Sequence, residues 1–204
     1  VFGQGHAVDR RLGALALQWA PSWLAPEMAA RLPFIALLVL TLLATWYTVY
    51  YLARSPGAQP VAFAFGGEAH PKDYARSMAD AGLLALLACL GLAQLSHEIT
   101  SYLAQLACTA LVFFAAAIQP YHPRRAAVTM PLGMAGLALA GAPTLATLLG
   151  LGCAALAWWA PAHTADRRRT AALAWAAATL ASMCLAWALD LWAWRIEPPQ
   201  AFLP

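Results

Sequence analysis

Residues 32–53 read LPFIALLVLTLLATWYTVYYLA, a run without one charged side chain between Arg31 and Arg54. As an α-helix rising ~1.5 Å per residue, this run is about 33 Å long and exceeds the ~30 Å hydrocarbon core of a bilayer. A helix also satisfies its own backbone hydrogen bonds, which lipid cannot do. The run therefore predicts a transmembrane helix. Four aromatic residues near its Arg54 end are typical of the belt at a membrane interface: Trp46, Tyr47, Tyr50 and Tyr51.

The composition of the whole chain points the same way. Hydrophobic residues make up 62% and charged residues only 10%, whereas soluble domains carry about 25% charged residues. The net charge of +3 is small and the basic residues fall between apolar runs, which suits a phospholipid surface and excludes a nucleic-acid partner.

The four cysteines lie far apart in apolar runs without a CxxC pattern, so we expect buried thiols and neither a zinc site nor a disulfide framework.

The first part of the chain predicts structure at the membrane surface. It begins without a methionine and shows no signal peptide, so we expect it to come from inside a longer protein. Residues 8–20 are amphipathic but too short to span a bilayer, which favours an interfacial helix. Pro26 is expected to open a second short helix and Pro33 to begin the long one. The predicted organisation is outer-face interfacial helices in 1–31 and a transmembrane helix bundle in 32–204.

Further apolar runs predict an all-α, polytopic bundle of about five to six membrane helices. Helices are expected at about 72–96, 101–119 and 170–194, the first with a face of small residues at Ala81, Ala85 and Cys89. The uncharged residues 126–165 are too long for one crossing and are divided at Ala142-Pro143. Two arrangements are open there: a hairpin of helices at 130–141 and 144–160, or one long kinked helix. The flanking runs YHPRR (121–125) and HTADRRR (163–169) are interpreted as basic loops.

The distribution of positive charge favours the hairpin. With a hairpin, eight basic residues lie on one side of the membrane and four on the other, whereas one long helix divides them evenly. Because cytoplasmic loops carry an excess of Lys and Arg, the uneven arrangement is preferred. It makes the N-terminal segment and His97-Glu98 external. The eight residues of the cytoplasmic set are Arg54, Lys72, Arg76, Arg124, Arg125, Arg167, Arg168 and Arg169.

Polar residues within the apolar runs are the candidates for chemistry. Glu98 stands out, because carboxylates near a membrane core are costly and often functional; Ser101 and Gln105 continue its helical stripe. Thr41, Thr45 and Thr48 are expected to bond back to their own helix. Interfacial ion pairs are expected between Asp80 and Arg76 and between Asp190 and Arg195. The five histidines form no metal-binding pattern, so no metal site is assigned.

The order of these segments resembles the membrane domain of the polyprenyl-phosphate-dependent, C-type glycosyltransferases, which include the aminoarabinose and protein O-mannosyltransferases. The segments that carry the likeness, all within about 12–160, are LGALALQW, APEMAARLPFIALLVLTLLATWYTVYYLAR, the turn HEIT and LGMAGLALAGAPTLATLLGLGCAAL. The resemblance implies transfer of a sugar from a polyprenyl-phosphate donor to a lipid or protein acceptor on the periplasmic face of a bacterial inner membrane. It also implies a divalent metal, or basic side chains, that offset the phosphate of the leaving group.

The family's catalytic acid lies in a first outer loop upstream of the position that Leu12 resembles, so no catalytic residue transfers directly. By position alone, the catalytic candidates are Glu98 and Asp9, with Arg10, Arg11, His97 and Ser101 as substrate-binding candidates. No cofactor is evident from the residues themselves. Two function classes stay open: a glycosyltransferase, or a fragment of one, and a non-catalytic membrane subunit or carrier that packs against partner helices.

Overall fold

The computed structural model describes residues 26–60, 69–89, 101–159 and 165–192, and every regular element within these ranges is helical. The prediction of an all-α chain is confirmed for this part of the protein. The α-helices are α2 (Pro26–Ala53), α3 (Pro71–Ala88), α5 (Ser101–Ile118), α6 (Pro123–Leu139), α7 (Pro143–Trp159) and α8 (Ala165–Ala188), and a 3-10 helix, η1 (Pro56–Ala58), follows α2.

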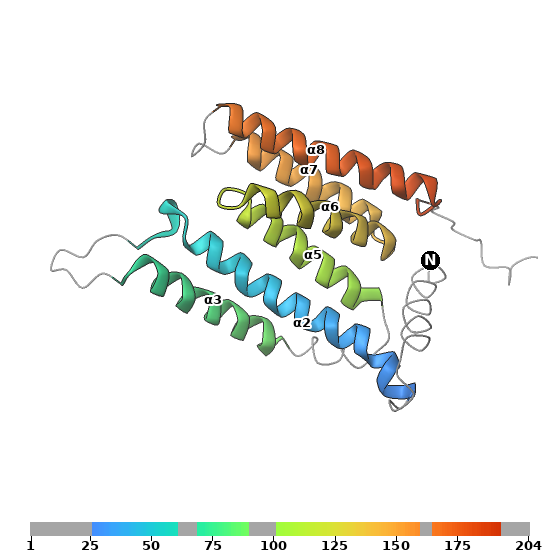
Figure 1. Cartoon of the computed structure of the whole chain (residues 1–204), viewed down its shortest axis with the longest axis horizontal. Helices are drawn as coiled ribbons and strands as arrows, with labels where there is room; N and C mark the ends of the chain where they lie inside the picture. The colour runs from blue at the N-terminus through green and yellow to red at the C-terminus, as the bar shows by residue number, and fades with distance from the viewer. Residues whose placement is uncertain (1–25, 61–68, 90–100, 160–164, 193–204) are drawn as a thin grey trace, which may run out of the picture.

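The helices lie side by side along one common direction (Figure 1). In space, α2 packs between α3 and α5, α6 packs on the far side of α5, and the α7–α8 pair packs on α6. Consecutive helices run in opposite directions, so the bundle has two distinct ends (Figure 1). At one end α2, α5 and α7 finish; at the other α3, α6 and α8 finish.

Helix α2 is longer than the sequence predicts. A separate short helix opened by Pro26 is wrong, because α2 runs without interruption from Pro26 to Ala53 with Pro33 inside it. Proline removes one backbone donor and strains the preceding turn, but a single lost bond near the start of 28 helical residues does not divide them. The same helix therefore carries the apolar run and the residues before it.

The packing face of α3 also differs from the prediction. Ala75 and Ala79 are completely buried, whereas Ala81, Ala85 and Cys89 are exposed. Among the described helices, α2 is the main packing partner of α3. The two helices are close at Gly82, where an added side chain would meet Val49 of α2. The helix ends at Ala88, short of the predicted residue 96, because Cys89 adopts an extended conformation.

The predicted hairpin is confirmed, and the single long helix is excluded. Helix α6 ends at Leu139, α7 begins at Pro143, and Gly141 makes the turn with a φ of 83° that an L side chain rarely adopts. Gln105 of α5 donates from Nε2 to the carbonyl of Ala140 at 2.8 Å and so satisfies one group freed by the turn.

The arginines of the two segments interpreted as basic loops lie in helices instead. Arg124 and Arg125 lie in the first turn of α6, because Pro123 occupies the first helical position, where proline is preorganised. The basic run 167–169 lies in the first turns of α8, where the carboxylate of Asp166 complements the positive end of the helix dipole.

The main core lies where α5, α6, α7 and α8 meet. Trp175 of α8 is 1% exposed and packs among the buried residues of this core, including Met134 of α6 and Cys153 of α7. Helix α7 turns small residues toward this core, and Ala146 and Gly150 are buried in it. A smaller cluster joins α2, α5 and α6 through Tyr51, Ala117, Ile118 and Ala126.

Within the described ranges, two helical segments are long and apolar enough to cross a membrane: Arg31–Ala53 and Ala165–Ala188. Tyr102–Ile118 and Pro143–Trp159 are shorter apolar helices. Only 22% and 28% of the residues in the two longer apolar windows are buried, so most of their side chains are at least partly exposed. Length and composition therefore suggest membrane association and leave the number of crossings open.

Candidate functional site

The positive charges gather at one end of the bundle. Arg54 follows the end of α2, and Lys72 and Arg76 lie in the first turns of α3. The starts of α6 and α8 carry the arginines 124–125 and 167–169 at the same end (Figure 1). We call this the basic end. Among the described residues, the other basic side chain is Arg31, near the start of α2.

Aromatic side chains of α2 stack on one another toward the basic end. Trp46 stacks on Tyr50 with ring centroids 5.4 Å apart, and the guanidinium of Arg54 lies 5.7 Å from the Tyr50 centroid. The same guanidinium lies 5.5 Å from the ring of Tyr121, which follows α5. Arginine is attracted to the faces of aromatic rings, so these contacts hold Arg54 between α2 and the turn that precedes α6.

Tyr121 is the central side chain of this cluster. Its ring lies 5.3 Å from that of the buried Tyr51. Burial raises the pKa of the Tyr121 hydroxyl, and the nearby charge of Arg54 lowers it in part. A raised pKa keeps this hydroxyl protonated through neutral pH, so it stays a hydrogen-bond donor.

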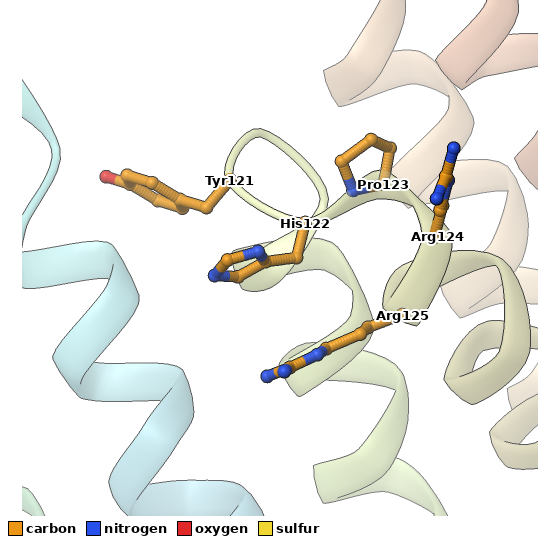
Figure 2. A pocket seen from close by; sticks show the side chains of 5 residues that line it. All are labelled: Tyr121, His122, Pro123, Arg124 and Arg125. Carbon is orange, nitrogen blue, oxygen red and sulfur yellow. The ribbon is translucent and has the colours of Figure 1, made fainter.

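A hollow of about 300 Å³ opens beside this cluster at the start of α6. Tyr121, His122, Pro123, Arg124 and Arg125 line it. Figure 2 shows Tyr121, His122 and Arg125 extending toward the cyan ribbon of α2, while Arg124 rises on the far side of Pro123. The side chains that border the hollow therefore include two guanidinium groups, an imidazole and a phenol. A smaller hollow of about 160 Å³ lies at the start of α8, lined by Trp158, Ala165, Arg168 and Arg169.

The predicted pair of Arg76 with Asp80 is wrong. Arg76 approaches Asp73 instead, with 3.6 Å between Nη1 and Oδ1, whereas Oδ1 of Asp80 accepts a 2.8 Å hydrogen bond from Nε1 of Trp46. Asp80 faces α2, where the indole N–H is available, and Asp73 lies one turn from Arg76. In the described parts of the chain, Arg76–Asp73 is the only ion pair.

The outer patch predicted from sequence falls largely outside the described residues. Asp9, Arg10, Arg11, His97 and Glu98 all lie there, as does Arg195, the expected partner of Asp190. Ser101 is the first residue of α5 and so belongs to the end opposite the basic end.

The neighbouring polar stripes are structural. Gln105 supports the α6–α7 turn through the carbonyl of Ala140. Thr41 and Thr48 donate to the carbonyls of Leu37 and Ala44 four residues earlier, at 2.8 and 2.6 Å. The expectation that hydroxyls of this stripe bond back to their own helix is confirmed for these two threonines.

The described residues contain no group of three or more His, Cys, Asp or Glu side chains that could hold a metal ion. The cysteines are free, and the expectation that all four are buried is wrong, because Cys89, just after α3, and Cys184, on α8, are exposed. Cys153 is buried and Cys108 half-buried. These thiols share no site.

Comparison of the chain with protein-family models, with curated proteins and with solved structures finds no match. The aromatic and basic cluster around Tyr121 and Arg54 is defined by the fold of this chain. The sequence signal was YHPRR following an apolar run, interpreted as a loop. Its pairing with Arg54 depends on α2 and α5 lying side by side, which local sequence does not specify.

Proposed function

We propose that this chain is the membrane bundle of a glycosyltransferase that moves a sugar from a polyprenyl-phosphate donor to a lipid or protein acceptor. The bundle lies in a bacterial inner membrane with its basic end in the cytoplasm. The charge polarity carries the membrane placement: of the basic side chains that the structure describes, all except Arg31 gather at one end. Cytoplasmic ends of membrane bundles carry this excess of Lys and Arg. Sugar transfer itself is proposed from the resemblance of the sequence segments to the glycosyltransferase membrane domain.

Helix lengths support a multi-pass arrangement. Helices α3, α5, α6 and α7 have 17 or 18 residues, or about 26 Å at ~1.5 Å per residue. A helix slightly shorter than a ~30 Å hydrocarbon core is accommodated by local thinning of the bilayer and by flanking side chains. With α2 and α8, the proposed bundle has six crossings, of which α3 and α6 carry charged residues of the basic end in their first turns. Large apolar side chains such as Leu84 and Leu148 would face lipid.

Chemistry is proposed at the end opposite the basic end. Helix α3 finishes there and α5 begins there, and the chain between them contains His97 and Glu98. A carboxylate such as Glu98 or Asp9 would take the proton of the acceptor as general base. Arg10, Arg11, His97 and Ser101 would bind the phosphate of the donor through hydrogen bonds, which are charge-assisted where the donor is an arginine. The expectation of a divalent metal rests on the family resemblance alone.

The topology makes a direct prediction. Residues 55–71, 121–129 and 161–169 should be cytoplasmic, and residues 1–31 and 97–100 external. Single cysteines placed at Ala165 and Thr100 in a Cys-less background, and treated with an impermeant thiol reagent on intact cells, should be protected and labelled respectively. Labelling at Ala165 together with protection at Thr100 would reverse the orientation and remove the basis for an external site.

The catalytic proposal predicts a loss of transfer in Glu98→Gln. General acid–base catalysis contributes about 10²-fold or more, so initial rates from a polyprenyl-phosphate sugar donor should fall by at least that factor. The change is made in the complete reading frame and in an active relative that carries this bundle. Asp73→Asn, which neutralises an exposed carboxylate at the basic end, is the matched control and should keep its rate. A loss of about tenfold or less, with normal expression, would make Glu98 a structural anion.

A non-catalytic membrane subunit or carrier is the second candidate, and one observation favours it. Ala81, Ala85 and Cys89 form a row of small residues on the exposed side of α3. Such a row lets another helix approach closely in a membrane. If the topology holds and no transfer is detected in the complete protein, while Ala85→Leu separates it from a co-purifying membrane protein, the subunit role replaces the enzyme.

A further inference from the structure

We propose that the hollow at the start of α6 binds the phosphate of an anionic phospholipid, whose acyl chains lie along the outer face of α6. The proposal rests on the membrane placement described above and is independent of sugar transfer. It assigns a cytoplasmic-leaflet lipid site at the basic end, away from the end proposed for chemistry.

The hollow lacks a protein counter-charge. Neither Arg124 nor Arg125 forms an ion pair with a described residue, and the first turn of α6 contains no acidic residue. His122, at the N-cap of α6, makes no capping hydrogen bond with its side chain. The free amide groups and the dipole of a helix N-terminus add to the positive potential of the two arginines. An anion is the ligand that this combination favours.

The surrounding side chains supply donors of suitable geometry. Tyr121, His122 and Arg125 extend toward α2 on the same side of the turn (Figure 2). Arg54, held against the Tyr121 ring at 5.5 Å, brings a further guanidinium to that side. Arginine binds phosphate oxygens through two parallel N–H···O hydrogen bonds. A phosphodiester beside Tyr121 would therefore be within reach of two guanidinium groups, those of Arg54 and Arg125.

The face of α6 below the hollow distinguishes a lipid from a soluble phosphate. Val128 follows Arg124 at four residues and Leu132 follows Arg125 at seven, so the two apolar side chains continue the exposed face of α6 that carries both arginines. Both are 59% exposed and lie about 6 and 12 Å along the axis from Arg124. A soluble phosphate would use the charged hollow alone. A phospholipid uses both, because its head is anionic and its tails are apolar.

Lipid-dependent stability tests the site. The complete protein is purified in a neutral detergent, and its thermal unfolding is followed while phosphatidylglycerol or phosphatidylcholine is added in mixed micelles. Phosphatidylglycerol should raise the unfolding temperature at concentrations where phosphatidylcholine does not. In Arg124→Gln/Arg125→Gln the half-saturating lipid concentration should rise at least about tenfold, because hydrogen bonds to charged groups contribute about 1.5–3 kcal/mol.

Matched variants separate a site from a general charge effect. Arg76→Gln removes a positive charge at the same end but outside the hollow, and its lipid dependence should equal that of the wild type. Leu132→Ser should weaken the effect of phosphatidylglycerol while helical content is unchanged. Arg125→Gln alone serves if the double variant does not fold.

Three results would overturn the proposal: equal stabilisation by both lipids, an equal loss in Arg76→Gln, or equal stabilisation by glycerol phosphate without acyl chains. None of these results involves sugar transfer. Normal lipid selectivity in a protein without transfer would refute the proposed function alone. Normal transfer without lipid selectivity would refute the lipid site alone.

Discussion

Replacing Trp175 with alanine is expected to cost about 3–5 kcal/mol of folding free energy, as for buried Trp-to-Ala changes in general. Trp175 is 1% exposed and lies in the core where α8 meets α5, α6 and α7. Its Nε1 donates to Oε1 of Gln119 at 2.8 Å and joins α8 to the end of α5. The alanine variant loses the packing of an aromatic ring and leaves the Gln119 amide without this partner.

Two controls identify the cause of that loss. Trp187 lies on the same helix but is 81% exposed, so Trp187→Ala should change the unfolding free energy by less than about 0.5 kcal/mol, as for surface positions. Trp175→Phe keeps an aromatic ring and loses the hydrogen bond, and should cost an intermediate amount. Denaturant unfolding in detergent micelles, followed by circular dichroism, measures all three. Equal losses at Trp175 and Trp187 would contradict the assigned core.

The sequence predicted those parts of the fold that depend on one segment alone. The apolar run 32–53 predicted a helix because its length and composition admit few alternatives, and the structure confirms it. The turn at Ala142-Pro143 was predicted because the proline and the uneven distribution of basic residues both favoured a hairpin over one long helix. The structure adds the conformation of Gly141, with a φ of 83°.

The parts that depend on two helices were not predicted. Helix α3 has small residues on more than one side, at Ala75 and Ala79 and again at Ala81 and Ala85. Sequence could not choose between them, because the choice depends on how α2 lies against α3. The same holds for Asp80, whose partner Trp46 is 34 residues away, whereas Arg76 is only four residues away.

The candidate site divides in a similar way. The aromatic residues near Arg54 were interpreted as a belt facing the interface, yet Tyr51 is buried against Tyr121 and Ile118. A belt can be recognised in one helix, but a cluster requires knowing that the end of α5 meets the end of α2. The outer candidates Glu98 and Asp9 stay predictions, because they lie outside the described residues.

Gly150 should tolerate no side chain, although glycine is a poor helix former. A Cβ added there would come into contact with Oγ1 of Thr179 on α8 and would lie 2.6 Å from Cε of Met134 on α6. Gly150→Ala should therefore cost about 1–3 kcal/mol of folding free energy, typical of an overpacked core, and Gly150→Leu about 3 kcal/mol or more. The loss arises because Thr179 is itself fixed by a 2.7 Å bond to the carbonyl of Trp175.

Gly152, two residues further along α7, is the matched control. Nothing lies within 4 Å of a Cβ added there, so Gly152→Ala gains only helix propensity and should be neutral or stabilising by up to about 1 kcal/mol. Unfolding of both variants in the same micelles gives the comparison, and opposite signs are expected. If Gly150→Ala is as stable as Gly152→Ala, then α7 does not approach α8 and α6 closely at this point. The core that surrounds Trp175 would then be packed differently.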